Sequence, residues 1–231
     1  MKTVAVILAG GSGKRLGSAL PKQFLDLAGK KIIEYSISAF EENQRIDEIL
    51  IVCNSQYIEY LQKIVDQKKY LKVKKILNGG KERSDSSLAA INQFNENVNL
   101  IFHDAVRPFV SQKIINECID SLEKYKALTV ALPSTDTIVK INSQNEVEEI
   151  LERKFLVNVQ TPQGFHWNVI KEAYSKALLD KDFIATDDSS VVKKYMPEVT
   201  VHIVEGESDN IKITYEKDLL LAESILTKKN L

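Results

Sequence analysis

The chain has few of the residues from which metal centres and disulfide frameworks are built. It carries only two cysteines, three histidines and one tryptophan in 231 residues. Cys53 and Cys118 stand apart in apolar segments without the spacing of metal ligands, which predicts reduced core thiols in a cytoplasmic protein. The scattered histidines argue against a metal site built from histidine.

Long apolar runs and strong charge are also missing. No apolar run approaches the roughly 18 residues of a membrane helix, and no charged-then-apolar leader begins the chain, so we expect neither a membrane span nor a signal peptide. The net charge of −1 excludes broad electrostatic capture of nucleic acid, so any cationic site must be local. The hydrophobic content of 44% is globular and predicts a single domain over 1–231.

Strand-like and helix-like segments alternate along the first 132 residues. The apolar runs that predict strands lie at 3–8, 48–53, 73–77, 100–102 and 128–132, and the helical spacings lie at 32–40, 58–65, 84–94 and 114–125. This order predicts an α/β fold with a mostly parallel sheet and helices on both faces. Ligands bind beyond the carboxyl ends of strands in such folds. We therefore expect one cleft to join the segments that follow the first, third and fourth strands.

The segment 133–159 interrupts this alternation. Residues 136–141 and 147–152 alternate polar and apolar side chains around the turn at 142–145. That pattern predicts a protruding two-stranded β-arm with too little apolar surface to form its own core. Such an arm must pack on something, and a second copy of the chain is a good candidate, so we expect a homodimer through 133–159.

A glycine loop with basic residues follows the first strand. It reads LAGGSGKRLG over 8–17 and is followed by PKQF over 21–24. Glycines let the backbone approach an anion closely, and Lys14, Arg15 and Lys22 add positive charge, which predicts a site for the triphosphate of a nucleotide. The spacing matches neither a P-loop nor a dinucleotide fingerprint. The alternative is a strand-to-helix turn with no ligand.

A second glycine turn, GGKERSDS over 79–86, leads into a helix. Arg83 and Ser86 lie on neighbouring helical positions, which suits hydrogen bonds to a base, a ribose or a phosphate. Ordinary helix capping by Ser84 or Asp85 is the alternative explanation.

Two further segments carry charged residues near the expected cleft. Asp104 ends a buried strand and could hold Mg²⁺, although an ion pair with Arg107 or a turn would also explain it. His103 beside it is expected to be structural, because no Ser or Cys nucleophile lies near. Lys212 follows an acidic turn in a predicted short strand, and either faces solvent or adds a third cation to the phosphate site.

These segments, in this order, resemble the cytidylyltransferases that act on sugar-alcohol phosphates. The motifs are LAGGSGKRLG with PKQF, GGKERSDS, HDAVRPF, QTPQGF and NIKIT, and the resemblance extends from Val4 to about Glu223. It is strongest to the 2-C-methyl-D-erythritol 4-phosphate cytidylyltransferase family of non-mevalonate isoprenoid biosynthesis, notably around Arg153 and over 186–192. The run 8–11 is more similar to the related ribitol-5-phosphate cytidylyltransferases. Lys81 stands where an acidic residue is common in the family.

The resemblance implies a Rossmann-like nucleotidyltransferase fold and a reaction of CTP with a polyol phosphate, giving a CDP-polyol and pyrophosphate. The substrate's own phosphate is then the nucleophile, so catalysis needs positioning and charge stabilisation and no catalytic triad. The resemblance implies that Arg15 and Lys22 stabilise the transition state, and that the polyol phosphate is positioned by Arg153, Lys212, Thr137 and Arg107. It implies that the nucleotide is bound by Ala9, Gly10, Gly11, Gly13, Gly80, Arg83, Ser86 and Asp104. Asp104 would also hold Mg²⁺ or another divalent cation.

Two alternatives to this function remain at the level of the sequence. The first is the same transfer to ribitol 5-phosphate, which would yield CDP-ribitol. The second is a nucleotide-binding regulator without catalysis, against which the joint presence of Arg15, Lys22, Asp104 and Lys212 argues.

Overall fold

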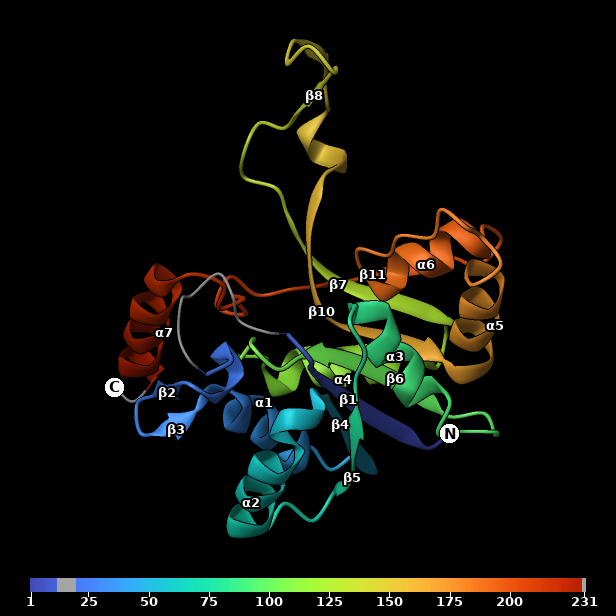
Figure 1. The fold of residues 1–231 in the computed structure, drawn as a ribbon. Helices are drawn as coiled ribbons and strands as arrows, with labels where there is room; N and C mark the ends of the chain where they lie inside the picture. Colours follow the sequence, from blue (N-terminus) through green and yellow to red (C-terminus); the bar gives the residue numbers. More distant parts are fainter. Residues whose placement is uncertain (12–19, 230–231) are drawn as a thin grey trace.

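The structure is a computed structural model that describes residues 1–11 and 20–229. Within these ranges a seven-stranded sheet forms the centre, in the order β11-β7-β10-β6-β1-β4-β5 (Figure 1). Its strands are β1 (Thr3–Ala9), β4 (Glu48–Cys53), β5 (Val73–Asn78), β6 (Asn99–Asp104), β7 (Ala127–Pro133), β10 (Val157–His166) and β11 (Val201–Glu205). The α-helices are α1 (Ile32–Glu42), α2 (Ile58–Lys68), α3 (Arg83–Ile91), α4 (Gln112–Leu122), α5 (Trp167–Ala177), α6 (Asp188–Tyr195) and α7 (Glu216–Lys229).

The pairing of the strands confirms a mostly parallel sheet. β1 pairs in parallel with β4 on one edge and with β6 on the other, so the strand order reverses at β1. In open α/β sheets such a reversal marks the crevice where ligands bind. The strands and helices predicted over the first 132 residues are all present, with ends that differ by less than one helical turn.

β10 is the exception, because it runs antiparallel between β6 and β7. Its first residues were predicted to belong to the arm over 133–159, and no strand was predicted for the motif QTPQGF that continues it. These residues lack an apolar run, since Gln160, Thr161 and Gln163 occupy buried positions in the strand. Their side chains are satisfied by hydrogen bonds inside the protein, so a polar segment becomes a central strand.

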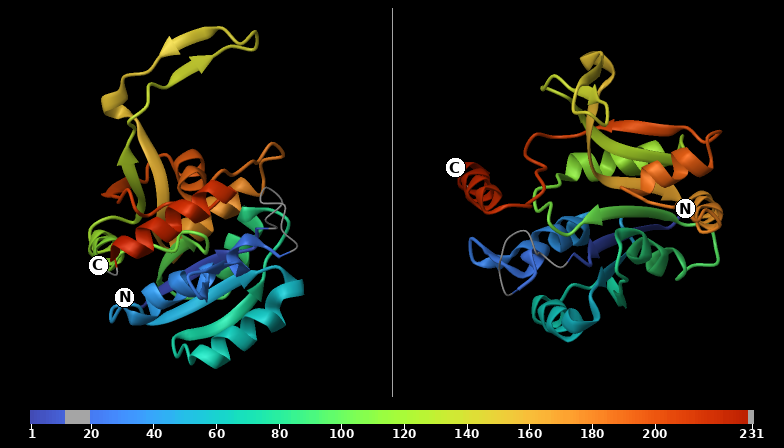
Figure 2. Two further views of the ribbon diagram at one scale, coloured as in Figure 1. Left: turned by 90° about the vertical axis from the view of Figure 1, so that its left-hand side faces the viewer. Right: turned by 45° about the horizontal axis from the view of Figure 1, so that its top comes forward.

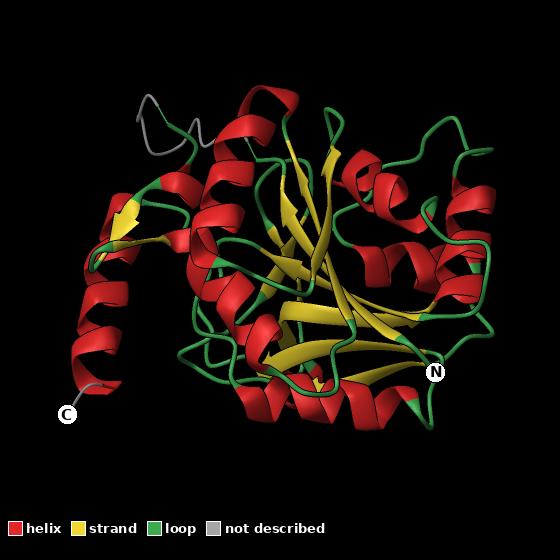
Figure 3. Ribbon diagram, turned by 90° about the horizontal axis from the view of Figure 1, so that it is seen from below, coloured by secondary structure: helices red, strands yellow, loops and turns green. Residues whose placement is uncertain are grey.

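Helices cover both faces of the sheet, as predicted. Alternate residues of β1 point to opposite faces, so Ile7 packs with α1, α2 and α4, while Val6 packs with α3, α5 and α6. A smaller apolar cluster, which includes Leu27, Ile213 and Ile225, joins α7 to the short hairpin β2–β3 (Asp26–Leu27 and Lys30–Lys31). In Figure 3 this hairpin and α7 lie together at one side of the sheet. No helix in the described ranges is both long enough and apolar enough to cross a membrane.

The predicted arm is present and projects from the body (Figure 2). It consists of β8 (Val139–Ile141) and β9 (Val147–Ile150), which pair antiparallel, and the short 3₁₀ helix η4 (Arg153–Phe155). Every residue of the two strands is exposed, and Ile150 and Phe155 keep 70% and 73% of their surface in solvent. An arm of this kind has no core of its own. Its role in dimerisation stays a prediction.

His103, near the carboxyl end of β6, is a structural residue, as expected. Its ring is fully buried, with Nε2 3.0 Å from the carbonyl oxygen of Arg107 and Nδ1 3.0 Å from the hydroxyl of Thr161. A carbonyl oxygen only accepts, so Nε2 carries the proton and Nδ1 accepts from Thr161. Burial lowers the pKa of His103 to about 4, and the ring is therefore neutral at pH 7.

We predict a pH-dependent loss of stability that depends on His103. Its pKa is lower in the folded state than the unfolded value of about 6.5, so the unfolded chain takes up the proton first. The stabilisation is complete above pH 6.5 and is lost as the pH falls towards 4, by about 3 kcal/mol. Urea unfolding from pH 7 to 4 should show this loss in the wild type and not in His103→Gln. Equal pH dependence of the two proteins would contradict the prediction.

Candidate active site

A cleft of about 810 Å³ opens at the carboxyl ends of β1, β4, β5 and β6. It joins the two glycine turns and the end of β6, which confirms that these three segments share one cleft. The predicted site residues among those that line it are Ala9, Gly10, Gly11, Lys22, Gly80, Arg83, Ser86, Asp104 and Lys212. Gly13 and Arg15 lie outside the described residues.

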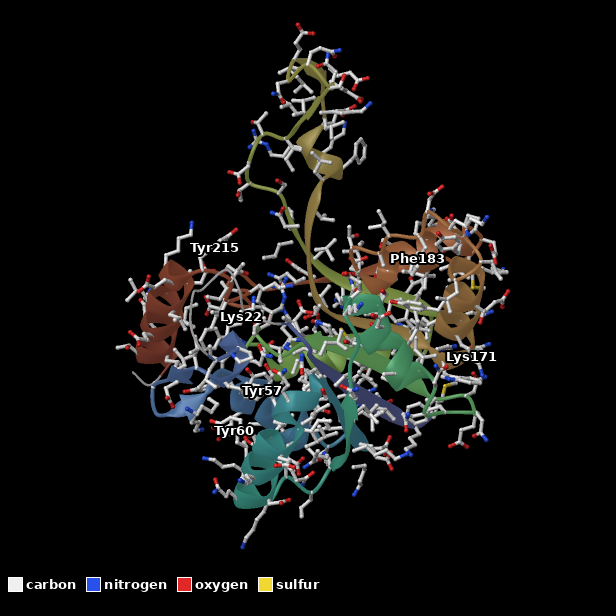
Figure 4. All side chains as sticks on the ribbon, viewed as in Figure 1. Lys22, Tyr57, Tyr60, Lys171, Phe183 and Tyr215 are labelled. Atoms are coloured by element: carbon white, nitrogen blue, oxygen red, sulfur yellow. The ribbon has the colours of Figure 1, made fainter. Side chains whose placement is uncertain are left out.

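The glycine loop is held at its start by a residue that follows it. The Gln23 side chain is buried and donates from Nε2 to the carbonyl oxygens of Ala9 (2.6 Å) and Gly11 (3.1 Å). Lys22, the preceding residue, lines the cleft in the short 3₁₀ helix η2 (Lys22–Phe24). In the view of Figure 4 it is drawn between Tyr215 and Tyr57. Gln23 was not among the predicted site residues, although its place next to Lys22 was a signal.

The second glycine turn packs directly on the first. A Cβ atom on Gly10 would lie 3.0 Å from the Ser86 hydroxyl oxygen, and one on Gly79 would lie 2.7 Å from it. At Gly80 a Cβ atom would come within 2.2 Å of the Cβ of Asp85. Side chains at these positions would displace the start of α3, so glycine is required where the two backbones meet.

Asp104 lies at the centre of a cluster of cations. Lys212 Nζ is 2.7 Å from Oδ2, Arg83 Nε is 3.7 Å from Oδ1, and Arg107 Nε is 3.9 Å from Oδ2. Burial alone would raise the pKa of Asp104, but the charges of Lys212 and Arg83 outweigh it and hold that pKa well below its usual range. The carboxylate is therefore ionised at neutral pH. Asp104 and Arg107 do pair, as the alternative explanation expected, but this is the longest of the three contacts.

Arg107 supports the cleft from behind. Its side chain is almost fully buried, it does not belong to the cleft lining, and Nη1 donates to the carbonyl oxygen of Asn210 at 2.8 Å. Asn210 in turn donates to the carbonyl oxygen of Thr161 at 2.8 Å and to Gln160 Oε1 at 3.1 Å. These bonds fix the segment that carries Lys212. The short strand predicted around Lys212 is wrong, because residues 211–214 form no strand. The backbone N–H of Ile213 does donate to the carbonyl oxygen of Val106 at 2.9 Å.

Arg83 connects the cleft to a second carboxylate, which was not among the predicted site residues. Its Nη1 lies 2.6 Å from Oδ2 of Asp188, the first residue of α6, which is fully buried. The two residues are 105 positions apart in the chain. The only sequence signal for this pair was the segment 186–192, a feature of the family resemblance to which no role is assigned.

Arg153 and Thr137 lie together on the arm. Arg153 Nη2 is 3.4 Å from the Thr137 hydroxyl, and Nη1 is 3.4 Å from the carbonyl oxygen of Thr135. Neither Arg153 nor Thr137 belongs to the part of the described chain that lines the cleft. Within one chain, the predicted positioning residues are thus divided between the cleft and the arm.

Comparison with known proteins finds relatives over nearly the whole chain. A family model described as IspD: 2-C-methyl-D-erythritol 4-phosphate cytidylyltransferase matches residues 3–228. The protein of that name from Thermobifida fusca (strain YX) is 42% identical over 232 residues, covering 97% of this chain and 93% of its own. The bifunctional ribulose 5-phosphate reductase/CDP-ribitol pyrophosphorylase Bcs1 of Haemophilus influenzae is also 42% identical. That alignment covers 99% of this chain and 49% of the Haemophilus influenzae protein.

Solved structures share the whole fold. The 4-diphosphocytidyl-2C-methyl-D-erythritol synthase from Anaerococcus prevotii DSM 20548 superposes with a TM-score of 0.87 at 28% identity, over 98% of this chain and 96% of its own. The 2-C-methyl-D-erythritol 4-phosphate cytidylyltransferase from Thermus thermophilus gives 0.77 at 28% identity, over 97% and 98%. With its sheet order, its cation-lined cleft and a family match over nearly its full length, the chain belongs to the 2-C-methyl-D-erythritol 4-phosphate cytidylyltransferase family.

Proposed function

We propose that this cleft binds CTP beside 2-C-methyl-D-erythritol 4-phosphate and joins them into a CDP-linked polyol, releasing pyrophosphate. The chain is a cytidylyltransferase by family. The observation that carries the assignment of the site is the meeting of both glycine turns, Lys22, Asp104 and Lys212 in one cleft. Two polyanions brought together there need positive charge and exposed backbone N–H groups.

The reaction requires positioning more than proton transfer. The phosphate of the polyol is already ionised at neutral pH and attacks the α-phosphorus of CTP, and pyrophosphate leaves. Lys22 stabilises the charge that develops on the α-phosphate, with Arg15 as its predicted partner. Gly80 and Ser86 hold the cytidine, because the second glycine turn and the start of α3 line the cleft beside the first glycine loop.

Asp104 fits the role of a magnesium ligand. Mg²⁺ is commonly held by one or two carboxylates together with substrate phosphates, and Asp104 offers an ionised carboxylate at the cleft wall. Among the described residues, the one cation within 4 Å of its Oδ1 is Arg83, at 3.7 Å and beyond hydrogen-bonding distance, whereas Lys212 occupies Oδ2. A metal ion held there with the phosphates of CTP would neutralise part of their charge. No group of three or more metal-binding side chains occurs in the described ranges, so substrate oxygens would supply the remaining ligands.

The arm completes the site of a second subunit in this proposal. Arg153 and Thr137 lie side by side, exposed, on a projection without a core. A guanidinium is suited to grip a phosphate with two parallel hydrogen bonds. We propose that arms exchange across a two-fold axis, so that each cleft receives Arg153 and Thr137 from the partner and keeps Lys22 and Lys212 of its own chain.

Ribitol 5-phosphate remains a specific second candidate substrate. The relative from Haemophilus influenzae that is named a CDP-ribitol pyrophosphorylase is as similar in sequence as the first one described above. Pyrophosphate release from CTP and Mg²⁺ should be measured with each polyol phosphate in turn. Release with the methylerythritol phosphate supports the proposal, release with ribitol 5-phosphate alone supports the second candidate, and CTP binding without release indicates a regulator.

A cytoplasmic location also stays a prediction. It is supported by Cys53 and Cys118, which are both unpaired and buried, as expected of thiols kept in a reducing compartment.

We predict that Lys22→Ala lowers turnover by at least about a hundredfold, because a preorganised charge is removed from the transition state. Steady-state pyrophosphate release measures the effect, and circular dichroism shows that the variant is folded. Lys30→Ala is the matched control, since Lys30 is exposed on the β2–β3 hairpin and does not belong to the cleft lining. A folded Lys22→Ala protein with a near-normal rate would exclude Lys22 from catalysis.

We predict that Ser86→Ala raises the KM for CTP by about three- to tenfold, which is the loss of one hydrogen bond. The KM for the polyol phosphate should change by less than about twofold, because the role proposed for Ser86 is to hold the cytidine. Ser84→Ala on the same helix is the control, since Ser84 does not belong to the cleft lining. Equal changes in both KM values would mean that this turn is only structural.

We predict that Arg153→Ala weakens use of the polyol phosphate and leaves CTP binding unchanged. Mixing it with Lys22→Ala protein tests the crossed arm. If arms cross, a hybrid dimer has both lesions in one site and an intact second site, so subunit exchange should restore about a quarter of the wild-type rate. Confirmed exchange without recovered activity would show that Arg153 serves its own chain.

A further inference from the structure

Asp188 is a buried carboxylate to which neither the fold nor the chemistry above gives a role. Its side chain is fully shielded from solvent, although it begins α6 and stands in the segment 186–192. The one cation that contacts it in the described chain is Arg83, at 2.6 Å. Desolvating a carboxylate costs several kcal/mol, and a buried ion pair rarely repays that cost in stability. A function for the pair other than stability is therefore worth seeking.

The carboxylate is fixed from several directions. Oδ1 accepts a hydrogen bond from the hydroxyl of Tyr174 at 2.7 Å, so Oδ2 is left for Arg83. The backbone N–H groups of Asp188 and Ser189 both donate to Oε1 of Gln163, at 3.1 and 3.3 Å. Gln163 belongs to β10 in the centre of the sheet. The start of α6 is thus anchored to the sheet, and Asp188 has little freedom to follow Arg83 if the arginine moves.

Arg83 is placed between two carboxylates on opposite sides. Its Nη1 is bonded to Asp188, whereas its Nε reaches only to 3.7 Å from Oδ1 of Asp104, beyond hydrogen-bonding distance. Its Nη2 is buried without a hydrogen-bond partner. An arginine next to a single carboxylate favours two parallel hydrogen bonds to it. Arg83 therefore does not form two parallel hydrogen bonds with Asp104, because its bond to Asp188 holds the guanidinium too far away.

Charge balance explains why this restraint matters. Three cations, Arg83, Arg107 and Lys212, surround Asp104, and Asp188 balances one of them. Without Asp188, Arg83 would have Asp104 as its nearest carboxylate. A bidentate pair would then cover Oδ1 of Asp104, the oxygen that has no hydrogen-bond partner among the cations around it.

Resting on the CTP-binding role proposed above, we infer that Asp188 is a positioning residue that holds Arg83 in the cleft wall and keeps Oδ1 of Asp104 open to the metal-bound nucleotide. Tyr174 contributes indirectly, because its hydrogen bond to Oδ1 orients the Asp188 carboxylate that holds Arg83. Neither residue belongs to the cleft lining, so neither acts on the substrate itself.

The test compares CTP binding by wild-type protein and Asp188→Asn, using isothermal titration calorimetry of the intact protein at several Mg²⁺ concentrations. Asp188→Asn should weaken CTP binding by at least about tenfold, since a hydrogen bond between charged groups is lost. The loss should grow as Mg²⁺ is lowered, and the KM for the polyol phosphate should change by less than about twofold. Tyr174→Phe should act in the same direction but more weakly, and it keeps the test decisive if Asp188→Asn does not fold.

Asp180→Asn is the matched control. Asp180 pairs with Lys194 of α6 at 3.0 Å, so the same chemical change is made near the same helix without touching Arg83. Its CTP affinity should equal that of the wild type.

A folded Asp188→Asn protein with wild-type CTP affinity would overturn the inference. Equal losses in CTP affinity and in use of the polyol phosphate would also overturn it, because they indicate a purely structural role. A crystal structure of Asp188→Asn supports the inference if Arg83 makes two bonds to Asp104 and overturns it if Arg83 has not moved. Wild-type protein that fails to bind CTP overturns the proposed function, and this inference with it. Wild-type binding with an unaffected variant overturns this inference alone.

Discussion

The cleft depends on β10, the strand that runs against all its neighbours. Hydrogen-bonded to β6 on one edge and β7 on the other, it carries three buried polar side chains that each fix a different part of the site. Gln160 bonds to the segment before Lys212, Thr161 bonds to His103 and to the N–H of Asp104, and Gln163 bonds to the start of α6. A polar strand in the middle of a sheet is costly unless every group is paired. Here the pairing organises the cleft.

The electrostatics of the cleft rest on local arrangement. The whole chain has a net charge of −1, yet three cations surround one carboxylate at the end of β6. Substrate phosphates would enter a field that is already built, so little reorganisation is needed as charge develops. The same crowding explains why the arginines are tethered from behind, Arg107 by Asn210 and Arg83 by Asp188. Untethered, they would pair with the nearest anion.

The parts of the molecule that the sequence predicts well have short-range signals. Apolar strands, glycine turns and an acidic residue at a strand end indicated the parallel sheet and the position of the cleft, including Asp104 and Ser86. β10 escaped prediction because glutamine and threonine at its buried positions interrupt the apolar pattern by which a buried strand is recognised. The partnership of Arg83 with Asp188 escaped because each residue alone also fits a simple helix start, and 105 positions separate them.

The position of β10 in the chain has a consequence for biosynthesis. Its partner β6 is complete at Asp104, but β10 begins only at Val157, and Lys212 is made later still. While the ribosome makes the intervening residues, β6 presents an open hydrogen-bonding edge beside an apolar core that still lacks α5 and α6. Nascent chains of this kind are exposed to strand-to-strand association with each other. The exposed arm emerges just before β10 closes that edge. The proposed crossover between two chains would therefore fall in the same interval of synthesis as the closing of that edge.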